Sequence, residues 1–147
     1  MISFCTKNQL KYASLIDTNL FGALTFYNAC IANNIKPIIG IELNVSYADV
    51  VFPIIFIAKS ELGYKNISKL SSIASQYQKG FIEFKVLAMY AQDVALIISS
   101  EDSYLANLLT NNKIFEANEF IDAIKNSFKE YYIGIYRYKG ANGRCIG

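Results

Sequence analysis

The chain has 147 residues, with 14 Lys and Arg, 12 Asp and Glu and no histidine, so its net charge is +2. Hydrophobic residues make up 53% and charged residues 18%, which is enough apolar material for a folded core and unlike a disordered protein. Without histidine the chain can contain no Ser-His-Asp or Cys-His machinery, no His-ligated zinc and no imidazole acid or base. A charge of +2 is also too small to indicate nucleic-acid binding by itself.

The first third of the chain is predicted as helix, strand, helix and strand. Residues 2–10 suit a helix, and residues 12–16 a short buried strand that ends at Asp17-Thr18-Asn19, which are good turn and N-cap residues. A helix is expected over residues 20–33, with an apolar face of Leu20, Ala23, Leu24, Tyr27 and Ile31. Residues 36–45 form the strongest strand, apolar on both faces until Glu42, as in a buried parallel strand.

The rest of the chain continues the alternation of strands and helices. Residues 51–58 predict a second buried strand, and Ser60 is expected to cap a helix to residue 77 with the face Ile67, Leu70, Ala74 and Tyr77. A helical turn is predicted over residues 86–91, an apolar strand over 94–98 and a helix over 103–109. A second helix follows over 117–128, with the face Ala117, Phe120, Ile121, Ile124 and Phe128, and a strand over 131–136.

This order predicts an α/β fold with about five mainly parallel strands covered by helices. No repeat or internal boundary is visible, so residues 1–139 are expected to form one domain, and residues 140–147 an unpatterned tail.

Carboxylates are the candidate site residues, because ligands of α/β folds gather at the carboxyl ends of strands. Asp17 ends the first strand and Glu42 lies in the carboxyl half of the next, while Ser99, Glu101 and Asp102 end a later one. Such groups can hold a divalent metal or act as acid and base. The alternative is that Asp17 caps the following helix and Glu42 is a solvated strand end.

The cysteines and lysines carry weaker signals. Cys5, Cys30 and Cys145 form no C-x-x-C pair, so we expect free thiols, two of them buried, in a reducing cytosol. The sequence shows no secretory signal, membrane span or Gly-rich phosphate loop. The densest positive region is expected to be a solvated face rather than a binding site, and consists of Lys36, Lys59, Lys65 and Lys69.

Several sequence strings together suggest a family. They are DTNLFGALTFY at residues 17–27, IKPIIGIE at 35–42, FPIIFIAK at 52–59, GYKNI at 63–67 and KLSS at 69–72. The series resembles the PHP (polymerase and histidinol phosphatase) domain of bacterial replicative DNA polymerase III alpha subunits, over roughly residues 12–72 and more weakly through 93–99 and 131–137. The resemblance implies a partial (β/α) barrel, in a family whose complete barrels have seven strands.

Active members of that family hold up to three metal ions on His, Asp and Glu side chains and hydrolyse phosphoesters. Here Glu42 matches the family Glu, Asp17-Thr18 stands where the family has Asp-His, and a further family His falls near Phe52. The family's first strand, which carries an H-x-H pair, is expected to be absent, because this chain resembles the family from the helix after that strand onward. The resemblance therefore implies a degenerate metal site with Asp17 and Glu42 as residual positions, no catalytic residue and no cofactor.

For function, the resemblance implies a PHP fragment of a cytoplasmic DNA polymerase III alpha subunit. The fragment would be a scaffold in DNA replication, within a nucleotidyltransferase whose polymerase palm this chain lacks. Its partners would be the remaining polymerase domains, with DNA reached only through that assembly and no membrane. The alternatives are a stand-alone PHP-type phosphoesterase and a generic α/β binding module. An incomplete barrel also predicts poor solubility or oligomers, because strand edges and apolar faces stay uncovered.

Overall fold

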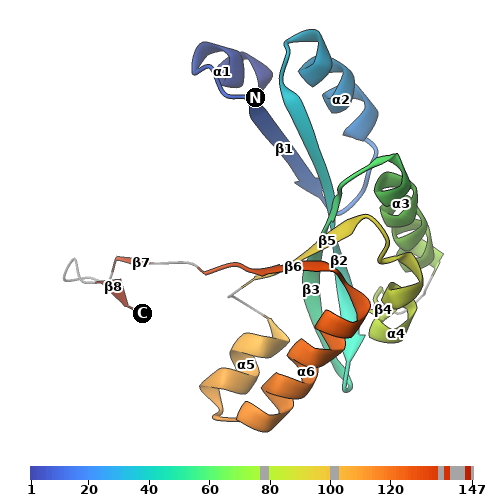
Figure 1. Cartoon of the computed structure of the whole chain (residues 1–147), viewed down its shortest axis with the longest axis vertical. Coiled ribbons are helices and arrows are strands. Elements are labelled where there is room, and N and C mark those ends of the chain that lie inside the picture. Colours follow the sequence, from blue (N-terminus) through green and yellow to red (C-terminus); the bar gives the residue numbers. More distant parts are fainter. Residues whose placement is uncertain (77–79, 100–102, 136–137, 140–144, 147) are drawn as a thin grey trace.

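The chain forms a twisted six-stranded sheet with helices packed against it, and a separate two-stranded sheet near the C-terminus (Figure 1). The computed structural model describes residues 1–76, 80–99 and 103–135, and the backbone of residues 138–139 and 145–146. In chain order the elements are α1 (Ile2–Lys7), β1 (Tyr12–Asp17), α2 (Ala23–Ala32), β2 (Lys36–Tyr47), β3 (Val50–Ala58), α3 (Glu61–Gln76), β4 (Ile82–Glu83), α4 (Phe84–Leu87), the 3-10 helix η1 (Ala88–Tyr90), β5 (Val94–Ile98), α5 (Tyr104–Thr110), α6 (Ile114–Ser127), β6 (Glu130–Ile133), β7 (Tyr138–Lys139) and β8 (Cys145–Ile146).

The main sheet has six strands. Five lie side by side in the order β1-β2-β3-β5-β6, and β4 pairs with β2 beyond the end of β1. The pairs β1–β2, β2–β4 and β5–β6 are parallel, whereas β3 is antiparallel to both β2 and β5. Every strand of this sheet except β3 therefore runs in the same direction. The result is a mixed α/β sheet that is not closed into a barrel.

The sheet is mainly parallel, as predicted, and β3 is the exception. Only Ala48 and Asp49 separate β2 from β3, and Tyr47 pairs with Val50 across the turn. The φ angles of Ala48 and Asp49 are 48° and 62°, the left-handed pair that a two-residue type I′ hairpin loop requires. A parallel connection would need a crossover of a dozen or more residues, so this short turn enforces antiparallel pairing.

The two faces of the sheet differ, because side chains alternate between them along each strand. The helix-covered face is built from the buried strand residues Ile41, Leu43, Val45, Phe52, Ile54, Phe56, Val94, Leu96 and Ile98. Helices α3 to α6 pack on it, and α1 and α2 pack on its continuation over β1. The open face carries the alternate residues Ile16, Ile38, Gly40, Glu42, Ile55, Ile57 and Ile97. None of the helices in the described part of the chain packs there.

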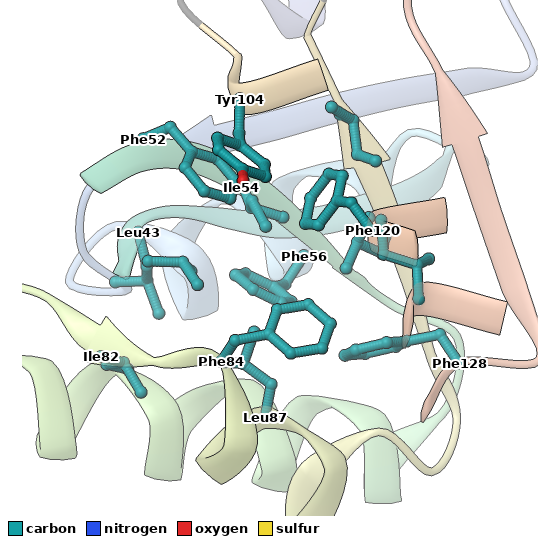
Figure 2. Packing of buried hydrophobic residues seen from close by; sticks show 14 of the residues in the cluster. Leu43, Phe52, Ile54, Phe56, Ile82, Phe84, Leu87, Tyr104, Phe120 and Phe128 are labelled. Atoms are coloured by element: carbon teal, nitrogen blue, oxygen red, sulfur yellow. The ribbon is translucent and has the colours of Figure 1, made fainter. Parts of the chain in front are cut away.

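An aromatic cluster joins the helices to the β2–β3 hairpin on the helix-covered face (Figure 2). The Phe52 ring stacks on Tyr104 of α5 with centroids 5.5 Å apart, and Phe120 of α6 meets both rings edge-on. Tyr47, at the end of β2, lies 5.2 Å from Phe84 of α4 and 5.0 Å from Phe120. Such pairs contribute about 0.5–1.5 kcal/mol each beyond their area burial, so one cluster fixes three helices.

Helix α2 buries a different face from the predicted one. Its buried residues are Ala23, Phe26 and Cys30, whereas Leu24, Tyr27 and Ile31 are 68%, 45% and 53% exposed. The prediction was wrong because this helix has apolar residues on every side, so more than one apolar stripe fits its sequence. Packing against β1 and Ile35 selects the stripe with the smaller Ala and Cys side chains.

The small cluster under α1 and α2 contains two cysteines. Cys5 and Cys30 are buried and free, as predicted, among Ala13, Phe26 and Ile35. Burial raises the pKa of the Cys30 thiol, and the neighbouring Cys5 raises it further. The side chain of Cys145 lies outside the described residues.

Some of the remaining predictions are confirmed, and some elements were missed. Strand β5 has the predicted bounds. Of the predicted apolar face, α6 buries Ala117, Phe120 and Ile124, Ile121 is half-buried, and the buried Phe128 directly follows the helix. Ser103 caps α5 by accepting a hydrogen bond from the Ala106 N–H. The sequence did not predict β4, β7 or β8. Strand β8 lies within residues 140–147, which were expected to be unpatterned, and pairs with β7. Tyr77 and Tyr136 lie outside the described residues. Within the described part, no helix combines the length and apolarity that a membrane crossing would need.

Candidate functional site

A notch in the sheet brings together two positions singled out from the sequence. On one edge of β2, β1 pairs up to Ile41 and β4 starts at Val45, so neither strand pairs with residues 42–44 there. A cavity of about 250 Å³ opens at this gap, beneath the end of α3. Its lining residues are Thr18, Glu42, Leu43, Asn44, Ser71, Ala74, Ser75 and Gly80. Thr18 and Glu42 thus border the same cavity, whose lining is mixed polar and apolar.

Asp17 lies at the carboxyl end of β1 but on the other face from Glu42. It is in register with Ile41, so it points toward the helix-covered face. Its carboxylate accepts a hydrogen bond from the Thr18 N–H at 2.7 Å. The N-cap of α2 is Gly22, so Asp17 does not cap that helix. The alternative interpretation, in which Asp17 caps the following helix, is therefore wrong, and its carboxylate instead accepts a hydrogen bond in the turn that follows β1.

Glu42 is exposed on the open face, where it is in register with Ile55 of β3. Because Ile41 and Glu42 are consecutive in β2, their side chains leave opposite faces of the sheet. The structure therefore places Asp17 and Glu42 on neighbouring strands without directing them to one point. Ser99 directly follows β5, while Glu101 and Asp102 lie outside the described residues.

These positions do not fit a multinuclear metal centre. Among the described residues, no group of three or more His, Cys, Asp or Glu side chains could hold a metal ion. The sequence contains no histidine, so no imidazole ligand is available there. The residues around the notch provide one carboxylate together with hydroxyl and amide groups. A multinuclear metal centre needs several carboxylate or imidazole ligands, so this donor set is too small.

A second polar cluster, which the sequence did not predict, lies at the other end of the sheet. There a cavity of about 390 Å³ is bordered by Lys59, Asp93 and Glu130. Lys59 forms an ion pair with Glu130, and the Ser60 hydroxyl donates to the Asp93 carboxylate at 2.7 Å. The same hydroxyl accepts the Gly63 N–H, which confirms Ser60 as the cap of α3.

This second cluster ties segments that are distant in sequence. The pKa of Lys59 is raised, mainly because its ammonium group donates a hydrogen bond to the Glu130 carboxylate. The Lys59 N–H also donates to the Asp93 carbonyl at 3.0 Å. Lys59 follows β3, Asp93 precedes β5 and Glu130 begins β6, so the contacts join the ends of three adjacent strands. No local pattern could have revealed them, because Lys59 and Glu130 are 71 residues apart.

The lysines of the predicted positive region each engage a neighbour. Lys65 pairs with Glu61 at 2.8 Å one turn earlier on α3. The ammonium of Lys69 lies 5.9 Å from the centroid of the Tyr90 ring, and that of Lys36 lies 5.8 Å from the Tyr12 ring. Local pairs of this kind are usual on solvated surfaces.

Comparison with known proteins shows the relationship directly. The chain is 32% identical over 141 residues to DNA polymerase III subunit alpha of Bacillus subtilis (strain 168), which covers 90% of this chain and 13% of that protein. The protein of the same name from Mycoplasma genitalium is 35% identical over 100 residues, covering 68% of this chain and 11% of its own length. That from Borreliella burgdorferi is 30% identical over 156 aligned positions, covering 94% and 13%.

The chain thus spans about an eighth of the length of these relatives and reproduces one part of them. The family model named PHP domain matches residues 1–137, which is nearly all of the sequence. The chain belongs to the PHP domain family.

Proposed function

We propose that the chain is the PHP part of a bacterial DNA polymerase III alpha subunit and acts there as a structural scaffold in DNA replication. The relatives that align with most of this chain are DNA polymerase III alpha subunits. In this proposal the polymerase chemistry belongs to other domains, which are the partners of the PHP part. Contact with DNA comes only through that assembly.

The layout of the sheet supports a barrel-derived scaffold. All packed helices of the described part lie on one face, as they lie on the outside of a (β/α) barrel. In this proposal the open face corresponds to the lumen side of a barrel that the described strands leave open. Five of the six strands of the main sheet also run in the same direction, as barrel strands do, and only β3 is reversed.

The observation that carries the scaffold role is the divergence of the two residual carboxylates. Asp17 points to the helix-covered face and binds its own turn, whereas Glu42 points to the open face. Thr18 stands at the position of a family histidine. Of the family's metal ligands, this chain therefore keeps only the carboxylates of Asp17 and Glu42, which point away from each other. We infer that the site has lost metal-dependent phosphoester hydrolysis.

The test is metal binding and hydrolysis by the purified chain. Calorimetric titration with Mn²⁺ and with Zn²⁺ is expected to show no tight binding, and p-nitrophenyl phosphate is expected to remain intact. The variants Glu42→Ala and Glu119→Ala, the latter an exposed residue on α6, are measured in parallel. Hydrolysis that disappears in Glu42→Ala but persists in Glu119→Ala would establish a phosphoesterase and overturn the scaffold role.

A further inference from the structure

Two free thiols lie together beneath the first two helices. Cys5 of α1 and Cys30 of α2 are 5% and 0% exposed. They belong to one small cluster, which also contains Ala13, Phe26 and Ile35. Burial raises the pKa of Cys30 and the charge on Cys5 raises it further, so the two thiols lie within range of each other. In the closed cluster Cys30 therefore stays protonated and unreactive, and its chemistry depends on whether the cluster can open.

Helix α1 is a weakly held cover over this pair. It has six residues, of which Cys5 alone is buried, whereas Phe4 is 64% exposed. No side chain caps its N-terminus, and its first turn contains no acidic residue. Helices this short are marginal in water, and segments with few buried contacts open far more often than the whole fold unfolds. Lifting of α1 brings Cys5 into solvent and uncovers the cluster that contains Cys30.

Cys30 is fixed in place, in contrast to Cys5. It lies in the last turn of α2, where its carbonyl oxygen accepts the N–H groups of Asn33 and Ile35 at 3.0 Å and 2.9 Å. Phe26, one turn earlier on α2, anchors this helix in the same cluster. The cluster thus holds a thiol on a segment that opens easily, and a second thiol to which that segment returns when it closes. A reactive thiol beside a resolving thiol is the arrangement of redox-sensitive cysteine pairs.

We propose that Cys5 and Cys30 form a peroxide-sensitive pair, whose oxidation to a disulfide fastens α1 to α2. When α1 is open, the Cys5 thiolate attacks one oxygen of hydrogen peroxide and the O–O bond breaks. The leaving hydroxide takes up the proton that the thiol released, which gives a sulfenic acid and water. The Cys30 sulfur then attacks the Cys5 sulfur, the S–O bond breaks, and the second hydroxide leaves as water with the Cys30 proton. The two thiols together lose two electrons and two protons, and the peroxide is reduced to two water molecules.

The disulfide should stabilise the chain measurably. It closes a loop of about 25 residues and so restricts the unfolded chain. For a chain of this size we expect the midpoint of thermal unfolding to rise by about 5–10 °C. This inference concerns the cluster alone and does not depend on the proposed function.

Intact-mass measurement and peptide mapping of the full chain test the pair. The chain is exposed to about 1 mM hydrogen peroxide, and the remaining thiols are then alkylated. We expect the chain to lose two hydrogen atoms and the peptides of Cys5 and Cys30 to be joined. The thermal midpoint should rise as stated above and return to its original value after reduction with dithiothreitol.

The matched control is Cys145→Ser, which removes the third cysteine of the sequence and should keep both the crosslink and the thermal shift. Cys5→Ala and Cys30→Ala should each abolish both effects, and circular dichroism checks that they fold. Peptide mapping of the original chain decides the question even if a variant does not fold. The proposal would be overturned if all three thiols remained open to alkylation after peroxide, or if the crosslink ran through Cys145. A Cys5–Cys30 crosslink that left the thermal midpoint unchanged would contradict the fastening of α1.

Discussion

The two faces of the main sheet differ in what covers them: helices pack on one face and leave the other open. Consecutive residues of β3 illustrate it, because Ile54 is 1% exposed under the helices whereas Ile55 is half-buried on the open face. Both positions look alike in the apolar string VFPIIFIA. The contrast shows that a continuously apolar strand predicts two apolar faces but does not say which covering each face receives. Here the helices supply one covering, and none of the helices in the described part of the chain packs on the other face.

The largest expected effect separates these two faces directly. Ile54→Ala removes side-chain atoms from the closed core and should lower the free energy of unfolding by about 2–5 kcal/mol. Ile55→Ala should cost less, about 1 kcal/mol, because the side chain already contacts solvent. Both are measured by urea denaturation at a concentration low enough for monomers. Equal losses in the two variants would mean that the open face is as closed as the helix-covered one.

A smaller effect is expected at the one tightly packed point of the open face. A Cβ at Gly40 would lie 2.5 Å from Ile57 Cδ1 and 2.9 Å from the Phe56 carbonyl oxygen. The isoleucine can turn aside but the carbonyl cannot, so Gly40→Ala should destabilise the fold by about 1–3 kcal/mol.

The matched control for Gly40→Ala is Gly22→Ala. Its new Cβ would meet only Leu15 Cδ2, at an ordinary 3.9 Å. Gly22 is the N-cap of α2, where alanine is slightly less favourable, so the loss should stay below about 1 kcal/mol. Thermal unfolding of the two variants compares them. If Gly40→Ala melted at the temperature of the original chain, the Phe56 carbonyl would not lie as close to Gly40 as described.

The sequence predicted those parts of the fold that local patterns determine. The strand over residues 94–98, most of the apolar stripe of α6 and the Ser60 cap depend on neighbours within a few positions, and all are confirmed. The direction of β3 could not be predicted in this way, because the turn at Ala48-Asp49 lacks the usual glycine. The buried stripe of α2 was missed because packing against β1, rather than periodicity, selects it.

The candidate site was predictable only in its residue types. Family resemblance indicated Asp17 and Glu42, but strand pairing and parity decide that their side chains leave opposite faces. The notch that unites Thr18 with Glu42 exists because β1 ends where β4 has not yet begun, and β4 was not visible in the sequence. The Lys59–Glu130 pair required knowledge of the strand order.

The two-faced sheet is tested most directly by a soluble paramagnetic probe read out on isoleucine methyl groups by NMR. At the lowest workable concentration, where monomers dominate, the account predicts strong relaxation of the open-face methyls of Ile16, Ile38 and Ile55. It predicts weak relaxation of the Ile41 and Ile54 methyls beneath the helices. Equal protection of both sets under these conditions would contradict the account, because it would show that the open face is already covered within a single chain.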